Sequence, residues 1–228
     1  MGNFWGIFWG RLPEFLPVLL VGFQTTLIVA VASFIIAMAA GLLLVMARLS
    51  QNRAVSVLAS TYIEFTRGTP ALTQLFIIYF GLAQLGVPLP GIVAAIAGLG
   101  LNGAAYVAEI FRAGLLAVPD GQRQAALSLG LTPLQTFFHV RVPQAIRLMA
   151  PPFCNYAIQL LKDTSLASVV AAPEVMFRAR ALVMETYLSM QIYVLVGIIY
   201  LCISIPLAIL ASRLQRRTGE IAMRSASA

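Results

Sequence analysis

Residues 118–143, VPDGQRQAALSLGLTPLQTFFHVRVP, form the longest polar stretch in a chain that otherwise consists mainly of apolar segments. The stretch contains the single histidine, His139, and a Gly-Leu-Thr-Pro sequence at 130–133. Because glycine and proline end helices, this pattern predicts two short helices joined by a turn. The hairpin that they form, residues 118–147, separates two apolar blocks, and we expect it to contact another molecule.

The composition places the chain in a membrane. Of its 228 residues, 60% are hydrophobic and only 10% are charged, whereas roughly 25% of the residues in a soluble domain are charged. The sequence therefore predicts an all-α membrane protein with a single domain, residues 1–228. The formal net charge is +7, but the arginines are scattered singly, which argues against nucleic-acid binding. Cys154 and Cys202 lie in apolar segments and are expected to be buried side chains rather than metal ligands.

Five apolar stretches reach the length of about 20 residues that a helix needs to cross a bilayer. The second contains a Gly-Thr-Pro break at 68–70, and the fourth contains Lys162 and Asp163. Residues 173–191, before the last stretch, are mixed in character and are expected to re-enter the bilayer or to lie on its surface. The predicted spans are residues 16–47, 54–85, 92–116, 149–172 and 192–212.

The arginines set the expected orientation. They concentrate in the connections after the first and third spans and behind the last span, and positively charged loops stay in the cytoplasm. This bias predicts five transmembrane helices with the N-terminus outside and the C-terminus and hairpin 118–147 in the cytoplasm. Residues 1–15 carry both tryptophans and are expected to lie on the outer surface of the bilayer as an aromatic anchor. The first apolar run is too long for a cleavable signal.

Polar side chains inside the predicted spans are the first candidates for a site. Glu64 and Arg67 lie about 15 and about 20 Å from the cytoplasmic end of the second span. Asn102, Gln159 and Asp163 reach similar depths on the third and fourth spans. Charges at such depth cost several kcal/mol unless they are paired or hydrated, so they usually line an internal pathway. The set therefore predicts a substrate pathway near the bilayer midplane.

A structural role is the alternative for these residues. Glu64 and Arg67 are spaced i, i+3 on a helix and could neutralise each other. Glu109 and Arg112 have the same spacing near the cytoplasmic end of the third span, and we interpret them as a structural ion pair. The break at 68–70 favours the pathway, because it frees backbone groups that need polar partners or water.

The hairpin contains a second, more specific pattern. Gln124, Ala125 and Ala126 are followed by Gly130 and, after nine further residues, by a Val-Arg-Val-Pro sequence that ends at Pro143. This spacing resembles the cytoplasmic signature of ABC-importer permease subunits: Glu-Ala-Ala, three residues, Gly, nine residues, Ile-x-Leu-Pro. The chain departs from the signature at Gln124, where a charge is lost, and at two conservative valines.

Three further stretches resemble the polar amino-acid branch of that family: EFTRGTPALTQLFIIYFGL at 64–82, NGAAYVAEIFRAGL at 102–115 and LLKDTSLASVV at 160–170. The resemblance covers nearly the whole chain and implies a type I ABC importer permease fold. It also implies transport of a polar amino acid or a related zwitterion. We expect Arg67 and the backbone amides near Gly68 to donate to the ligand carboxylate, and Asp163 or Glu64 to accept from its ammonium group. The pocket residues that the resemblance implies are Glu64, Thr66, Arg67, Gly68, Thr69, Asn102, Tyr106, Gln159, Asp163 and Ser165.

The resemblance further implies partners and a location. Two permease subunits, identical or merely similar, would pack face to face on ABC ATPase subunits in the inner membrane of a bacterium, and an external solute-binding protein would deliver the ligand. The hairpin would be the ATPase contact, through Gln124, Ala125, Ala126, Gly130 and Pro143. The sequence has no glycine-rich phosphate loop. We therefore expect ATP on the partner ATPase, no cofactor or metal on this chain, and a transport subunit rather than an enzyme.

Three alternatives differ in substrate or in class. An opine or an ectoine-type solute would suit the same architecture. A stand-alone ion-coupled carrier would require an internal repeat and a proton relay, and we find no repeat in the five spans and no histidine within them. An integral membrane enzyme would require clustered catalytic groups, whereas His139 stands alone in the hairpin.

Overall fold

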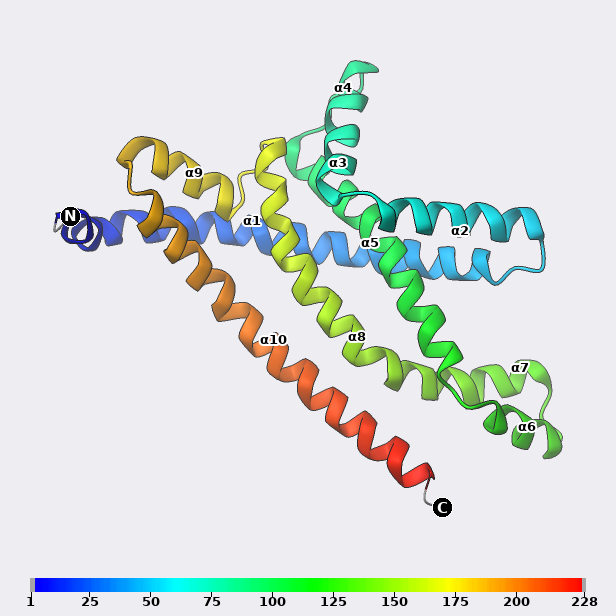
Figure 1. Ribbon diagram of the computed structural model, residues 1–228. Helices are drawn as coiled ribbons and strands as arrows, with labels where there is room; N and C mark the ends of the chain where they lie inside the picture. The colour runs from blue at the N-terminus through cyan, green and yellow to red at the C-terminus, as the bar shows by residue number, and fades with distance from the viewer. Residues whose placement is uncertain (1–2, 227–228) are drawn as a thin grey trace.

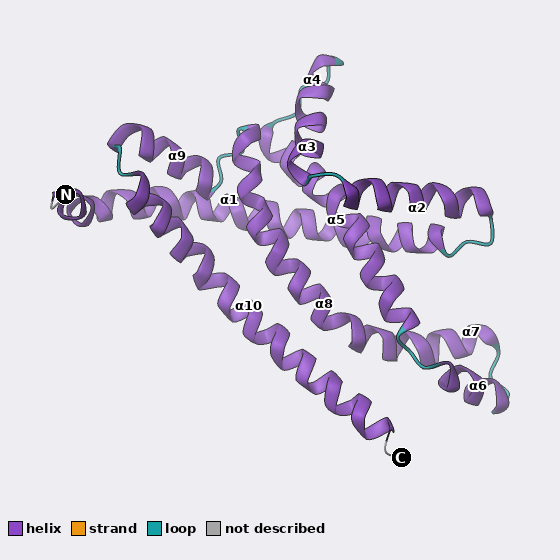
Figure 2. Cartoon of the chain, viewed as in Figure 1, coloured by secondary structure: helices purple, strands orange, loops and turns teal. Residues whose placement is uncertain are grey.

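The computed structural model describes the backbone of residues 3–226 and the side chains of residues 5–215, and this part of the chain is helical without strands (Figures 1 and 2). Residues 1 and 2 of the predicted anchor lie outside the described part. In chain order the elements are α1 (Asn3–Arg48), α2 (Arg53–Gly68), α3 (Ala71–Phe76), the π-helix η1 (Ile77–Gly81), α4 (Leu82–Gln84), α5 (Gly91–Leu116), α6 (Asp120–Ser128), α7 (Pro133–Gln135), the π-helix η2 (Thr136–Arg141), α8 (Val142–Asp163), the 3-10 helix η3 (Thr164–Val170), α9 (Val175–Thr186) and α10 (Ser189–Ala226).

Three helices in the described part are long and apolar enough to cross a membrane: Trp5–Arg48, Gly91–Leu116 and Ser189–Gln215. The second and fourth predicted spans, 54–85 and 149–172, are not single α-helices. The former divides at Pro70, which lacks the N–H that would continue α2, into α2 and the α3–η1–α4 unit. The latter changes from α-helix to 3-10 helix after Asp163. The number of five spans stays a prediction.

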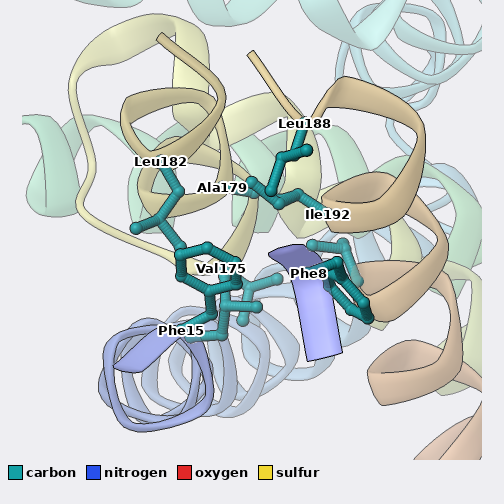
Figure 3. Packing of buried hydrophobic residues seen from close by; sticks show 9 residues of the cluster. Phe8, Phe15, Val175, Ala179, Leu182, Leu188 and Ile192 are labelled. Carbon is teal, nitrogen blue, oxygen red and sulfur yellow. The ribbon is translucent and has the colours of Figure 1, made fainter. Parts of the chain in front are cut away.

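α1 joins the predicted anchor to the first predicted span in one helix. Trp5 and Trp9 are exposed, as expected of an anchor. Phe8, in contrast, is buried and packs with Phe15 against α9 and the start of α10 (Figure 3). The helical spacing of the aromatic residues shows which face they share, but it does not show that another helix covers Phe8.

The hairpin has one short arm and one long arm. α6 is short, as predicted, and the turn after it contains Gly130 at φ +84°, a backbone conformation that favours glycine. The second arm starts with Pro133 at the first turn of α7 and with a capping box at Thr132. It then runs through η2 directly into α8, so the prediction of a second separate short helix is wrong. Pro143 does not break this arm; it lies where the π-helix η2 passes into the α-helix α8 and the hydrogen-bond pattern changes.

α5 is the central helix, packed along α1 and against α8 (Figure 1). Its glycines let α8 approach closely. A Cβ atom at Gly103 would lie 1.8 Å from the Tyr156 hydroxyl oxygen, and one at Gly114 would lie 2.2 Å from Met149 Cγ. Small residues at helix contacts are typical of membrane bundles, where close packing replaces the hydrophobic effect. They place the aromatic ring of Tyr156 directly against α5.

A buried carboxylate joins three helices on the other side of the molecule. Glu174 is completely buried and caps α9 by accepting hydrogen bonds from the backbone N–H groups of Met176 and Phe177 at 2.9 and 2.8 Å. It also accepts from the hydroxyl groups of Thr26 on α1, at 3.4 Å, and Tyr200 on α10, at 3.3 Å. Burial raises the pKa of Glu174 to about 7, and the hydrogen bonds oppose that rise.

Candidate functional site

A cavity of about 530 Å³ lies between α2, α5 and α8. The Arg67 guanidinium stands 5.9 Å above the ring of Tyr106, a cation–π arrangement. Tyr106 in turn stacks on Tyr156, with ring centroids 6.3 Å apart, and Phe34 of α1 covers Tyr156 at 6.1 Å. The cavity is lined by Arg67, Tyr106, Glu109, Ile110, Ala113, Gly114, Ala117, Leu148, Met149, Pro152 and Tyr156.

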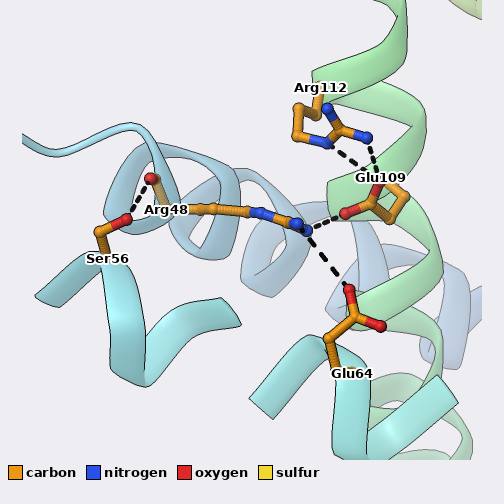
Figure 4. A network of polar contacts seen from close by, with 5 residues as sticks. All are labelled: Arg48, Ser56, Glu64, Glu109 and Arg112. Atoms are coloured by element: carbon orange, nitrogen blue, oxygen red, sulfur yellow. Dashed lines mark hydrogen bonds and ion pairs between the residues drawn. The ribbon is translucent and has the colours of Figure 1, made fainter. Parts of the chain in front are cut away.

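An ion cluster borders this cavity (Figure 4). Glu109, which lines the cavity, accepts from Arg48 at the end of α1 and from Nε and Nη2 of Arg112 at 3.0 and 2.9 Å. Arg48 Nη2 also lies 3.8 Å from Glu64 of α2, and its backbone carbonyl accepts from the Ser56 hydroxyl at 2.8 Å. The cluster therefore ties the α1–α2 turn to α5 beside the cavity.

The pair between Glu64 and Arg67, which was the structural alternative, is replaced by other contacts. Glu64 faces Arg48, and Arg67 faces Tyr106. The Glu109–Arg112 ion pair is present as predicted. The sequence did not reveal that Arg48 also pairs with Glu109. Arg48 was predicted to lie in a connection, and it reaches Glu109 only because α1 packs along α5.

The break after α2 is closed by Gln74. Its side-chain amide donates to the carbonyl oxygen of Thr66 at 2.8 Å and to the hydroxyl and carbonyl of Thr69 at 2.7 and 3.4 Å. Asn102 of α5 donates to the Gln74 side-chain oxygen at 3.1 Å. The break thus has the polar partners that the sequence required. Thr66, Gly68, Thr69 and Asn102 do not line the cavity, and three of them hold this junction instead.

The predicted residues on α8 and η3 lie outside the cavity lining and make local contacts. Gln159 donates to Asp163 at 2.9 Å, and both lie on the same helical face as Tyr156. The Ser165 carbonyl accepts from Ser168 at 2.8 Å. Of the ten predicted pathway residues, the cavity brings together Arg67 and Tyr106. Sequence reasoning missed Tyr156, whose polar ring on an apolar helix was the available signal.

The hairpin presents an apolar surface. Leu129, Leu134 and Phe138 are 81%, 68% and 57% exposed, on the turn and the second arm. Gln124 and Ala125 are also exposed, whereas Ala126 is buried. These side chains are free of contacts with the rest of the chain over much of their surface.

The base of the hairpin is fixed to α5. Arg141 Nη2 donates to the Leu115 carbonyl at the end of α5 at 3.1 Å. Val118 packs with Ala145 and Met149 in a buried cluster. The hairpin is therefore joined at its base to α5 and α8, the two helices that form most of the cavity wall. No group of side chains in the described residues is arranged to hold a metal ion.

Most of the chain matches one known protein family. Residues 33–220 match the family described as binding-protein-dependent transport system inner membrane component. The chain belongs to this family. It is accordingly an integral membrane protein, in agreement with its apolar helices.

Relatives of this inner membrane component match over most of its length. The probable amino-acid ABC transporter permease protein YckA of Bacillus subtilis is 35% identical over 90% of both chains. The nopaline transport system permease protein NocM of Agrobacterium fabrum is 36% identical over 84% of this chain and 83% of its own. A chain from the crystal structure of an amino acid ABC transporter with histidines is 34% identical with a TM-score of 0.87, over 91% of this chain and 97% of that chain. The resemblance to ABC permeases is thereby confirmed.

Proposed function

We propose that this chain is the permease subunit of an ATP-driven importer for a polar amino acid or a closely related zwitterion. The observation that carries the proposal is the cavity that holds Arg67 against Tyr106, in a chain whose relatives are amino-acid permeases. A guanidinium group binds a carboxylate through paired hydrogen bonds, and the remaining wall is apolar enough to accept a side chain.

The path through the bilayer is formed by five spans, with the N-terminus outside and the C-terminus in the cytoplasm. α2 with α3–α4, and α8 with η3, supply the second and fourth spans as broken units. Helices that are interrupted near the midplane are a common device for substrate sites in transporters. Gln159 and Asp163 extend the polar face of α8 beyond Tyr156, and we assign them to the same path.

The energy for transport comes from a partner protein. The hairpin 118–147 docks on an ABC ATPase subunit through its exposed apolar side chains, in the manner of a helix in a groove. ATP binds to that partner, and this chain performs no chemical reaction. A second permease subunit completes the path, and a solute-binding protein delivers the ligand on the outer side of the bacterial inner membrane.

Uptake by the reconstituted complex tests the site. Arg67→Ala should reduce the uptake of the cognate amino acid about tenfold or more, because a charge-assisted hydrogen bond is lost. Arg53→Ala, at the exposed start of the same helix, is the matched control and should transport normally. Wild-type uptake kinetics in Arg67→Ala would remove Arg67 from the site.

Co-purification tests the hairpin. Gly130→Val places a β-branched residue at φ +84°, which costs about 1–2 kcal/mol and distorts the turn. The yield of ATPase bound to the permease should fall, whereas Gly121→Ala in α6 should retain it. An unchanged yield for Gly130→Val would contradict the docking assignment.

An opine is the second candidate substrate, because the nopaline permease NocM is 36% identical. Opines also carry carboxylates and would use the same guanidinium. Competition of nopaline against a labelled amino acid in the uptake assay separates the two candidates.

A further inference from the structure

The two ends of the cavity between α2, α5 and α8 differ in polarity. Arg67 and Glu109 stand at one end, beside Tyr106. The opposite end is hydrocarbon, from residues such as Ala113 and Leu148. A ligand in this cavity therefore meets charge at one end only, and that charge determines which ligands can enter.

The polar end of the cavity carries an excess of positive charge. Together with Arg67, the ion cluster sets three arginines, Arg48, Arg67 and Arg112, against two carboxylates, those of Glu64 and Glu109, so one positive charge is in excess. Low-dielectric walls strengthen the field of such a charge inside a cleft. The cluster attracts a carboxylate and repels a cation.

The hydrogen-bonding capacity of Glu109 also disfavours a ligand with a second cationic group. A carboxylate offers about four acceptor sites. Glu109 already accepts three hydrogen bonds, from Arg48 Nη1 and from Nε and Nη2 of Arg112. One site is left, which suffices for the α-ammonium group of an amino acid and leaves none for a second cationic group.

Two other groups that attract cations, the Tyr106 ring and the Asp163 carboxylate, already have partners. Arg67 covers the face of Tyr106 that would otherwise attract a cation. Asp163, the carboxylate of α8, accepts from Gln159 and does not line the cavity. A guanidinium or ammonium side chain would therefore be buried without a counter-ion, which is strongly unfavourable.

We propose that this cavity selects its substrate by charge: it accepts amino acids whose side chain is neutral and discriminates against arginine and lysine. The carboxylate faces Arg67, the α-ammonium takes the last acceptor site of Glu109, and the side chain points toward Leu148. This inference rests on the proposed function and specifies the substrate class of that same site.

Binding to the assembled permease–ATPase complex in lipid nanodiscs, without the solute-binding protein, tests the proposal. Methionine and lysine are the matched probes, since their side chains are similar in length and differ in charge; glutamine and arginine complete the panel. Methionine and glutamine should bind about tenfold or more tightly than lysine and arginine. Equal or tighter binding of lysine or arginine overturns the inference and leaves the proposed function intact. Absence of binding and of uptake for every amino acid overturns both.

A second experiment inverts the charge of Arg67. Arg67→Glu should lower the preference for methionine over lysine about tenfold or more, and Arg67→Gln, which alters the fold less, should lower it in the same direction by a smaller factor. Arg53→Glu makes the same change of charge on the same helix, outside the cavity lining, and should leave the preference unaltered. An unchanged preference in the Arg67 variants, or an equal shift in Arg53→Glu, contradicts the proposal.

Discussion

Glu109 and Glu174 are two carboxylates withdrawn from water, and their partners differ in kind. Glu109 is held by two guanidinium groups, Arg48 and Arg112. Glu174 is held by two backbone N–H groups and two hydroxyl groups, all of them neutral. Both carboxylates join helices that are distant in sequence. The carboxylate beside the cavity is thus paired with charged groups, whereas the carboxylate in the joint between α1, α9 and α10 is held by neutral donors.

The distinction has a functional meaning. Guanidinium partners place additional charges beside the cavity, whose field a polar ligand senses, whereas neutral donors hydrogen-bond a carboxylate without adding a charge of their own. The joint at Glu174 therefore suits a rigid support. The cluster at Glu109 suits a site that discriminates between ligands.

The largest expected effect comes from removing the charge of Glu109. Glu109→Gln leaves Arg48 and Arg112 without their shared anion, and breaking a buried ion pair is strongly destabilising. Because the two arginines are 22% and 34% exposed, solvent reduces the loss to about 2 kcal/mol in the free energy of unfolding. Denaturation of the purified protein in detergent measures it. A variant as stable as the wild type would show that neutral donors could serve equally well at this position.

A smaller effect, dependent on pH, is expected at Glu174. Its pKa is raised from 4.5 to about 7 in the folded protein, so the folded state favours the protonated form. Its contribution to stability is therefore full below about pH 4.5, declines as the pH rises through about 7, and is level above that value. The wild type should lose more than about 1 kcal/mol between about pH 5 and about pH 8.

Glu174→Gln is the variant that isolates this pH dependence. Glutamine retains one oxygen acceptor for the cap of α9 and does not titrate, so its stability should vary less over the same range. Thermal denaturation at several pH values compares the two proteins. Identical pH profiles would show that Glu174 is not the titrating group.

The smallest effect is expected at Glu64. Its side chain is 65% exposed and lies 3.8 Å from Arg48, and exposed pairs contribute little. Glu64→Gln should change the free energy of unfolding by less than about 0.5 kcal/mol. A loss as large as that of Glu109→Gln would make the cluster a three-helix unit rather than a pair with an exposed neighbour.

Sequence reasoning and structure agree best where the signal is local. The turn at Gly130, the capped start at Pro133 and the break at Pro70 follow from the conformational limits of glycine and proline. The predicted cavity residues were recovered only in part, because helical spacing identifies a shared face but not the helix that covers it. Phe8 illustrates this limit: its spacing fits a surface anchor, yet α9 and α10 bury it.

The sequence by itself determined the membrane class, the hairpin and the family, because composition, turn residues and motif spacing are properties of the chain in one dimension. Only the tertiary structure decided which charges meet. Arg48 reaches Glu109 across 61 residues, and Thr26 reaches Glu174 across 148. Such pairs form because close helix packing brings the side chains together and burial then requires each polar group to find a partner. The same helix packing brings Arg67, Tyr106 and Tyr156 together around one cavity. The hairpin 118–147 is joined to that cavity through α5 and α8.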